Sequence, residues 1–359
     1  MAKIIFVIPS ISDSHFKNRI TEFQKYGYEV EVFGFARVEQ KRPDSLPYKY
    51  TIIGELCDED YFKRTVLYLK AFKKLGNTFK SKSVLFYLTG LDIALFFHFA
   101  NPSVKYIYEE CDLAHTYRMM LKKPLEWVDK RIIKKSVLTV LTSGGFIEYH
   151  FAGKKPDNVV LVENKLNPSI LNYPSKENRK LSLDSISLGF VGGPRFNSIY
   201  NFIDVFCRNY PNGTFHVYGG PVPPQFEQLR KYKNCVFHGF FNNPSDLPDI
   251  YQSIDMVVAT YDTKYENVKY AEPNKIYESI YFETPIVVSK GTFLASKVEK
   301  LGIGYSVDAM NENEIVEFVR SITSESIEKR ILNAQRIDKR ETLNNNEHLF
   351  KIIDKIWKG

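Results

Sequence analysis

The chain has 359 residues and a formal net charge of +7, and its length is sufficient for two domains with separate cores. Its apolar and charged fractions are ordinary for a soluble globular protein, and no apolar run is long enough to span a membrane. No basic and apolar signal segment leads the chain, and the four cysteines have neither close pairing nor metal-ligand spacing. We therefore expect a cytoplasmic protein with reduced thiols, without a membrane span or a cysteine-bound metal.

Residues 1–165 alternate between short apolar runs and amphipathic stretches, which predicts a parallel, doubly wound α/β sheet. Strands are expected at 3–8, 29–35, 84–88, 104–108 and 137–141. Ligands of such sheets bind beyond the carboxyl ends of the strands. The polar loops that follow these strands are therefore the candidate binding loops of this half.

Two stretches of the first half concentrate positive charge. Residues 61–82 carry seven Lys or Arg and no acid, and residues 118–135 carry seven more against two acids. Both have helical apolar spacing, and basic amphipathic helices suit an anionic membrane surface. Two solvated lysine-rich faces would give the same pattern. No nucleic-acid-binding motif accompanies these stretches, so we expect no nucleic-acid partner.

Residues 164–185 are polar and punctuated by proline, which predicts a linker. A second α/β series follows, with strands expected at 186–191, 214–218, 235–238, 256–260 and 286–289. A last amphipathic helix is expected over 349–357. The chain is thus predicted to contain two domains, 1–165 and 166–340, with a terminal segment at 341–359.

The stretch 271–289 predicts a short helix, a tight turn and a buried strand. Pro273 suits the first turn of the helix, and Pro285 cannot continue it. Lys275 and Glu278 are three residues apart, so they share one face. A helix N-terminus with Lys275 beside it favours phosphate, and Glu278 can accept two hydrogen bonds from a ribose diol. Together these groups would hold a nucleoside diphosphate.

The spacing Pro273-Asn274-Lys275-x-x-Glu278 followed by Pro285 resembles the donor-site helix of family 4 glycosyltransferases, above all bacterial members that build capsule, exopolysaccharide or lipopolysaccharide. The resemblance implies the GT-B fold, in which two Rossmann-like domains face a cleft. The first domain would be on the acceptor side, the second would bind the nucleotide sugar, and the last helix would cross back to the first.

The same resemblance implies the chemistry. The donor would be a UDP- or GDP-linked sugar, with no cofactor and no catalytic metal, and the acceptor a glycan or a lipid pyrophosphate at an anionic membrane surface. The anomeric configuration would be retained. Many relatives carry a second glutamate eight positions before Glu278, where this chain has Tyr270, so that carboxylate is either missing or displaced to Glu266 or Glu272.

The donor site implied by the resemblance draws on several loops. Arg195, after the run Gly189-Phe-Val-Gly-Gly193, matches the family's diphosphate-binding arginine, whose planar fork suits a bidentate phosphate grip. Arg195 and Lys275 would stabilise the leaving diphosphate and so act catalytically. Tyr218 is equally well explained as a core aromatic. The implied donor-binding residues are Gly192, Gly193, Arg195, Tyr218, Gly219, Phe240, Asn274, Lys275 and Glu278.

In the first domain the implied acceptor-side residues are Ser14, His15, Glu110 and Asp112. Asp13, His15 and Asp112 are the candidate catalytic bases that inversion would need. Ser14 could instead cap a helix, and His15 could be a solvated loop residue. His115 lies one helical turn beyond Asp112 and could pair with it.

Two other functions fit the same fold. One is a non-transferase GT-B enzyme such as a sugar-nucleotide epimerase, which would need a carboxylate cluster at the cleft. The other is a degenerate sugar-nucleotide-binding partner subunit, which the missing glutamate at Tyr270 favours and the presence of Arg195, Lys275 and Glu278 disfavours.

Overall fold

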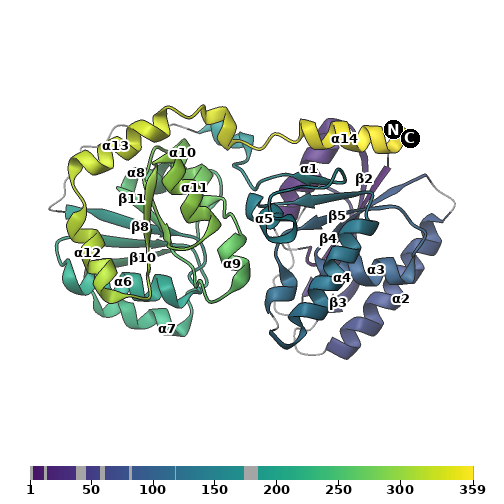
Figure 1. Cartoon of the computed structure of the whole chain (residues 1–359), viewed down its shortest axis with the longest axis horizontal. Coiled ribbons are helices and arrows are strands. Elements are labelled where there is room, and N and C mark those ends of the chain that lie inside the picture. The colour runs from purple at the N-terminus through teal and green to yellow at the C-terminus, as the bar shows by residue number, and fades with distance from the viewer. Residues whose placement is uncertain are drawn as a thin grey trace. The chain divides into compact units, whose positions relative to one another are not determined.

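The computed structural model describes residues 3–11, 14–37, 46–56, 61–80, 83–117, 119–173 and 185–358. The chain forms two compact α/β units, shown in Figure 1. The first unit comprises Met1–Glu163 together with Asn345–Gly359, and the second comprises Asn164–Asn344.

The first unit is built on a seven-stranded parallel sheet with the order β3-β2-β1-β4-β5-β6-β7. Its central strands are rich in β-branched and aromatic residues and are buried on both faces, as parallel strands usually are, whereas the edge strand β3 is largely exposed or half-buried. The strands are β1 (Lys3–Ile8), β2 (Glu29–Arg37), β3 (Tyr50–Leu56), β4 (Leu85–Thr89), β5 (Tyr106–Glu110), β6 (Leu138–Leu141) and β7 (Val159–Leu161).

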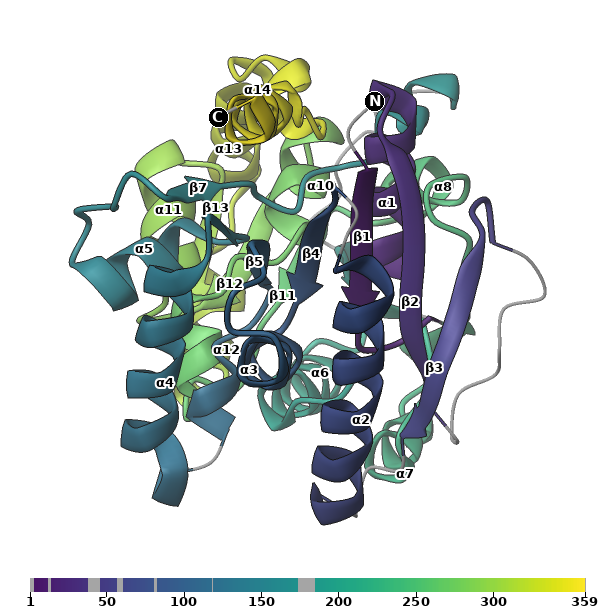
Figure 2. The same ribbon diagram turned by 90° about the vertical axis from the view of Figure 1, so that its right-hand side faces the viewer.

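Helices cover both faces of this sheet. Figure 2 shows three of them, α2, α3 and α4, side by side on one face, where Phe35 of β2 packs against Tyr68 of α2 with ring centroids 4.8 Å apart. The helical segments of this part are α1 (Ser14–Tyr26), α2 (Tyr61–Phe79), α3 (Leu91–Ala100), η1 (Ala114–Tyr117), η2 (Met119–Leu121), α4 (Lys122–Lys135) and α5 (Gly144–Phe151).

The last helix, α14 (Glu347–Lys358), packs in the first unit although it ends the chain. The ring of Phe350 meets that of Phe23 on α1 edge to face, with centroids 5.0 Å apart. The hydroxyl of Tyr28 donates to Asp354 at 2.7 Å, and Arg19 donates to Asn346 at 2.8 Å. Both apolar and polar contacts therefore hold α14 in the first unit.

The second unit has a six-stranded parallel sheet with the order β10-β9-β8-β11-β12-β13. Because all its strands are parallel, the loops after β8, β9 and β11 leave the same edge of the sheet. The strands are β8 (Ser187–Val191), β9 (Thr214–Tyr218), β10 (Cys235–Gly239), β11 (Met256–Ala259), β12 (Ile286–Ser289) and β13 (Gly304–Val307).

Two apolar clusters fill the two faces of the second sheet. One packs strand residues against α6 and α12, and the other packs them against α8, α10 and α11. The helical segments are η3 (Pro168–Asn172), α6 (Asn197–Asn209), α7 (Pro224–Glu227), η5 (Gln228–Lys231), α8 (Leu247–Ser253), α9 (Glu266–Tyr270), α10 (Lys275–Tyr281), α11 (Phe293–Leu301), α12 (Glu312–Ser321), α13 (Ser324–Gln335) and η6 (Lys339–Thr342).

The predicted pair of parallel α/β domains is confirmed, with several local corrections. The sequence did not predict β3, β7 or β13, and β5 ends two residues later than expected. The donor helix begins at Lys275, so Pro273 precedes it instead of forming its first turn. Residues 174–184 of the predicted linker lie outside the described residues. Among the helices that the structure describes, none combines the length and apolar composition needed to cross a bilayer.

Candidate functional site

Glycine turns bring three loops of the second unit into main-chain contact at the carboxyl ends of β8, β9 and β10. The N–H of Gly192 donates to the carbonyl of Tyr218 at 2.7 Å, and that of Gly219 donates to the carbonyl of Gly239 at 2.6 Å. Gly219 has φ +124°, and a Cβ there would lie 2.2 Å from the carbonyl oxygen of Gly192. No larger residue fits at Gly219 without displacing the backbone of Gly192, and Gly193 is the exposed glycine of the first turn.

Arg195 follows these turns and is exposed. Its guanidinium carbon lies 5.1 Å from the ring centroid of Phe196, and within the described chain it has no ion-pair partner. Burial raises the pKa of Tyr261 and the charge of nearby Arg195 opposes that rise, which places the two groups close together. Arg195 is thus a charged group that is free to bind an anion.

The loop after β11 fixes the start of α6, directly beyond Arg195. The N–H of Ser198 donates to the carboxylate of Asp262 at 2.7 Å, and Asp262 is 5% exposed. The ring of Phe196 meets that of Tyr261 edge to face, with centroids 5.2 Å apart. Asp262, which the sequence analysis did not single out, therefore holds the arginine-bearing loop in place.

Lys275 and Glu278 contact each other instead of facing a ligand separately. The ammonium of Lys275 donates to both carboxylate oxygens of Glu278 at 2.8 Å. Asn274 donates to Oε1 at 2.9 Å, and the hydroxyl of Tyr251 donates to Oε2 at 2.7 Å. The carboxylate of Glu278 is fully buried, whereas the side chain of Lys275 remains 10% exposed.

This arrangement changes the role expected for Glu278. A carboxylate has about four acceptor positions, and the contacts from Lys275, Asn274 and Tyr251 occupy all of them. A ribose diol would have to displace one of these donors. An ammonium has three N–H groups, so Lys275 retains one for a ligand. In this structure Glu278 therefore positions Lys275.

The aromatic residues of the predicted donor site differ in exposure. Tyr218 is 8% exposed, its hydroxyl contacts Ser253 Oγ at 2.7 Å, and its ring stacks on His238 with centroids 4.0 Å apart. Phe240 is 79% exposed and its ring lies over Gly220. The structure thus places Tyr218 beneath the turns and Phe240 on the surface beside them.

The glutamates that might replace the family's missing carboxylate lie on α9 and just after it. Glu266 is half-buried in the first turn of α9, and Tyr270 ends that helix. Glu272 is 5% exposed and pairs with Lys297 at 2.6 Å, and the hydroxyl of Tyr277 also donates to it. Glu272 is therefore already neutralised by a lysine of α11.

The first-unit candidates are less closely grouped. Asp13 lies outside the described residues, and Ser14 and His15 are the first two residues of α1. Asp112 is exposed after β5 and accepts a long contact of 3.5 Å from Tyr117. His115 does not pair with Asp112: its Nδ1 lies 3.1 Å from Asp129.

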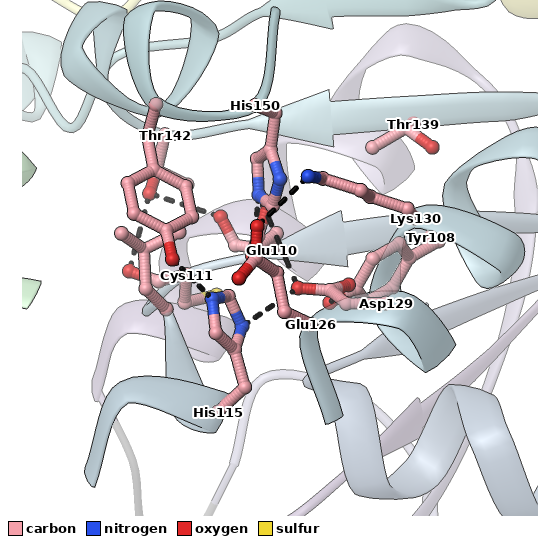
Figure 3. A network of polar contacts seen from close by, with 12 residues as sticks. Tyr108, Glu110, Cys111, His115, Glu126, Asp129, Lys130, Thr139, Thr142 and His150 are labelled. Atoms are coloured by element: carbon pink, nitrogen blue, oxygen red, sulfur yellow. Dashed lines mark hydrogen bonds and ion pairs between the residues drawn. The ribbon is translucent and has the colours of Figure 1, made fainter. Parts of the chain in front are cut away.

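Glu110 was expected in an open loop, but it is the last residue of β5 and is fully buried. Its carboxylate contacts His150 Nε2 at 2.9 Å, as Figure 3 shows. An acceptor would not reach this carboxylate without a rearrangement of the strand end. The sequence analysis did not single out Asp129 or His150. They are 19 and 40 residues from Glu110 in the sequence, and these separations match no ligand motif.

One known protein family resembles the second half of this chain. Residues 189–355 match a family model described as Glucosyltransferase 3-like, C-terminal domain. Among curated proteins, none matches this sequence.

Solved structures match the whole chain. Sucrose-phosphate synthase from Thermosynechococcus elongatus aligns with TM-score 0.72 and 14% identity over 99% of this chain and 98% of its own. HepE from Anabaena, in complex with UDP and glucose, aligns with TM-score 0.71 and 14% identity over 100% and 99%. The lipopolysaccharide outer core galactosyltransferase WaaB aligns with TM-score 0.65 and 14% identity over 98% of both chains.

The fold is GT-B, as the resemblance implied. The matched segment, residues 189–355, is a glycosyltransferase domain. The family model is Glucosyltransferase 3-like, so assignment to family 4 stays a prediction.

Proposed function

We propose that this GT-B glycosyltransferase moves a sugar from a UDP-sugar to a glycan or lipid-linked acceptor during synthesis of a bacterial surface polysaccharide. The observation that carries the proposal is the set of glycine turns after β8, β9 and β10, with Arg195 beside them, which has no ion-pair partner among the described residues. Backbone N–H groups and an arginine fork are the groups that bind a diphosphate. WaaB and WaaG, which share the fold, are named for lipopolysaccharide and support the proposed pathway class.

The choice of UDP rests on the structural neighbours. HepE is described with UDP, with UDP and glucose, and with UDP-glucose, and MnaA of S. aureus is described with UDP. The exposed Phe240 beside Gly220 offers a ring face for a base or ribose. The sugar itself is left open by these residues.

A thermal-shift panel tests the donor class. We expect UDP and UDP-sugars to raise the melting temperature by several degrees, because a ligand that binds only the folded state stabilises it. GDP-, ADP- and CMP-sugars at the same concentration serve as controls. If GDP-sugars raise the melting temperature and UDP-sugars do not, the glycosyltransferase uses a different donor. If no nucleotide raises the melting temperature, the result contradicts the donor site.

The proposed mechanism is retention of the anomeric configuration. The leaving diphosphate then accepts the acceptor's proton on the same face, so the enzyme's main contribution is positive charge at the diphosphate. Arg195 supplies that charge, and the remaining N–H of Lys275 adds a second donor whose position Glu278 fixes. Inversion would instead require a base such as Asp112 on the opposite face.

Peripheral membrane binding through the first unit completes the proposal. The segment before α4 and the start of that helix expose apolar side chains: Met120 is 95% exposed and Trp127 63%. The solvent-facing sides of α2 and α4 carry the exposed lysines, Lys63, Lys70, Lys73, Lys74, Lys123, Lys130, Lys134 and Lys135. Apolar residues beside lysines are typical of helices that lie in an anionic interface.

Liposome sedimentation should show binding that requires anionic lipid and falls with added salt, because exposed charges are screened over about 8–10 Å at physiological ionic strength. Replacing Met120 and Trp127 by serine should weaken binding and leave its salt dependence in place. Replacing Lys134 and Lys135 by glutamine should reduce the salt dependence. Equal binding of the wild-type chain to neutral vesicles would contradict the electrostatic part.

A further inference from the structure

Two carboxylates and two imidazoles meet in the interior of the first unit, apart from the donor site (Figure 3). Glu110 comes from the end of β5, His115 from η1, Asp129 from α4 and His150 from α5. All four side chains are 0% exposed. One ligand atom from each of Glu110, Asp129 and His150 lies within 4.8 Å of the others.

The contacts converge in the way that ligands surround a cation. His115 Nδ1 and Asp129 Oδ2 are 3.1 Å apart, yet in the described part of the chain neither atom makes a hydrogen bond. His150 Nε2 is 2.9 Å from Glu110 Oε2 and 3.9 Å from Asp129 Oδ2. Ligand atoms of a tetrahedral zinc site, with bonds of about 2.0–2.2 Å, lie roughly 3.3–3.6 Å apart. Small shifts would bring the ligand atoms of Glu110, Asp129 and His150 to that spacing, whereas His115 approaches Asp129 alone.

The two buried carboxylates also favour a bound cation. Among the described residues, the ion-pair partners of Glu110 and Asp129 are the two histidines. The nearby ammonium of Lys130 pairs with Glu126 at 2.8 Å. A divalent ion would compensate both carboxylates and leave the imidazoles neutral, as metal ligands are.

The groups behind this cluster resemble the outer shell of a metal site. The hydroxyl of Tyr149 contacts the second ring nitrogen of His115 at 3.1 Å. The hydroxyl of Tyr108 donates to the second oxygen of Asp129 at 3.1 Å. Such contacts fix the orientation of ligating histidines and carboxylates, and they are a regular feature of protein metal sites.

We propose that Glu110, Asp129 and His150 bind a divalent transition metal ion of the zinc class, with His115 orienting Asp129 beside it. The ligand set of nitrogen and carboxylate oxygen suits zinc, and manganese and cobalt are the alternatives. Because every ligand is fully buried, the ion has a structural role: it ties β5, α4 and α5 together. It takes no part in sugar transfer, for which the GT-B resemblance implies no metal.

The test uses the full chain purified without a histidine tag. We expect about one zinc ion per chain by elemental analysis, a lower melting temperature after removal with a chelator, and recovery on adding zinc, cobalt or manganese. Magnesium is the negative control, because it prefers an all-oxygen shell with several waters. The proposal is overturned if the chain carries no metal and none of the three ions raises its melting temperature. The buried side chains would then form a network that shares protons.

Variants locate the ion. Asp129→Asn and His150→Gln should each lose most of the bound metal and the zinc-dependent rise in melting temperature. His98→Gln is the matched control, since His98 also has a ring nitrogen without a hydrogen bond in the described part of this unit. If the variants retain the metal, the ion lies elsewhere and the proposal fails. Should both variants misfold, the chelation and recovery of the wild-type chain still decide whether metal is bound.

Discussion

Replacing Arg195 by alanine should nearly abolish sugar transfer and leave the fold intact. The leaving diphosphate develops negative charge, and the exposed guanidinium of Arg195 lies beside the glycine turns. Removing one such stabilising group typically lowers kcat by about 10²–10³-fold. Because Arg195 is exposed, the free energy of unfolding should change by less than about 0.5 kcal/mol. Initial rates of UDP release with and without acceptor measure the loss.

Two variants serve as controls for Arg195→Ala. Arg208 is an exposed arginine near the other end of α6, which at 1.5 Å per residue lies roughly 18 Å from the turn. Arg208→Ala should therefore leave turnover unchanged. Asp112→Asn should lower turnover by less than about tenfold if the diphosphate is the base. A loss of several orders of magnitude in Asp112→Asn, with donor affinity unchanged, would identify a protein base and contradict retention.

Replacing Lys275 by methionine should destabilise the second unit severely. The carboxylate of Glu278 is fully buried, and both its oxygens accept from the ammonium of Lys275 at 2.8 Å. Breaking a buried ion pair by removing one partner costs about 3–5 kcal/mol, because it leaves an uncompensated charge in the interior. Urea unfolding followed by circular dichroism should show a clearly lower midpoint for this variant.

The double variant Lys275→Met/Glu278→Gln provides the control. A neutral glutamine can still accept from Tyr251, so the double variant should recover much of the lost stability. Neither variant should bind UDP as well as the wild type, because both lack the ammonium. If Lys275→Met is as stable as the wild type, the ion pair does not hold the donor helix, and Glu278 is available to a ribose as first expected.

The positions of the glycine turns after β8 and β9 could be predicted because short-range patterns determine them. Buried β-branched runs followed by glycine mark the ends of β8 and β9, where Gly192 and Gly219 adopt positive φ. The pairing of Lys275 with Glu278 also follows from their spacing on one helical face. What the spacing could not show is that the two groups face each other, since Tyr251, from a separate helix, completes the shell of Glu278.

The first unit was harder to predict because its polar contacts are long-range. Glu109 and Glu110 have the pattern of a solvated loop, yet both are fully buried in β5. Glu109 is tolerated there because Arg19, 90 residues away, donates to it at 3.2 Å. Glu110 meets His150 across 40 residues. Without these partners in view, two consecutive acids argue against a buried strand.

Calorimetric titration of UDP into the wild-type chain and Arg195→Ala tests the central claim most directly, with uridine as the ligand that lacks the diphosphate. A charge-assisted contact contributes about 1.5–3 kcal/mol, and every 1.4 kcal/mol is tenfold in affinity. We therefore expect UDP to bind Arg195→Ala about 10–100-fold more weakly than the wild type, and uridine to bind both equally. Equal UDP affinity in the two chains would contradict a diphosphate site at the glycine turns of the second unit.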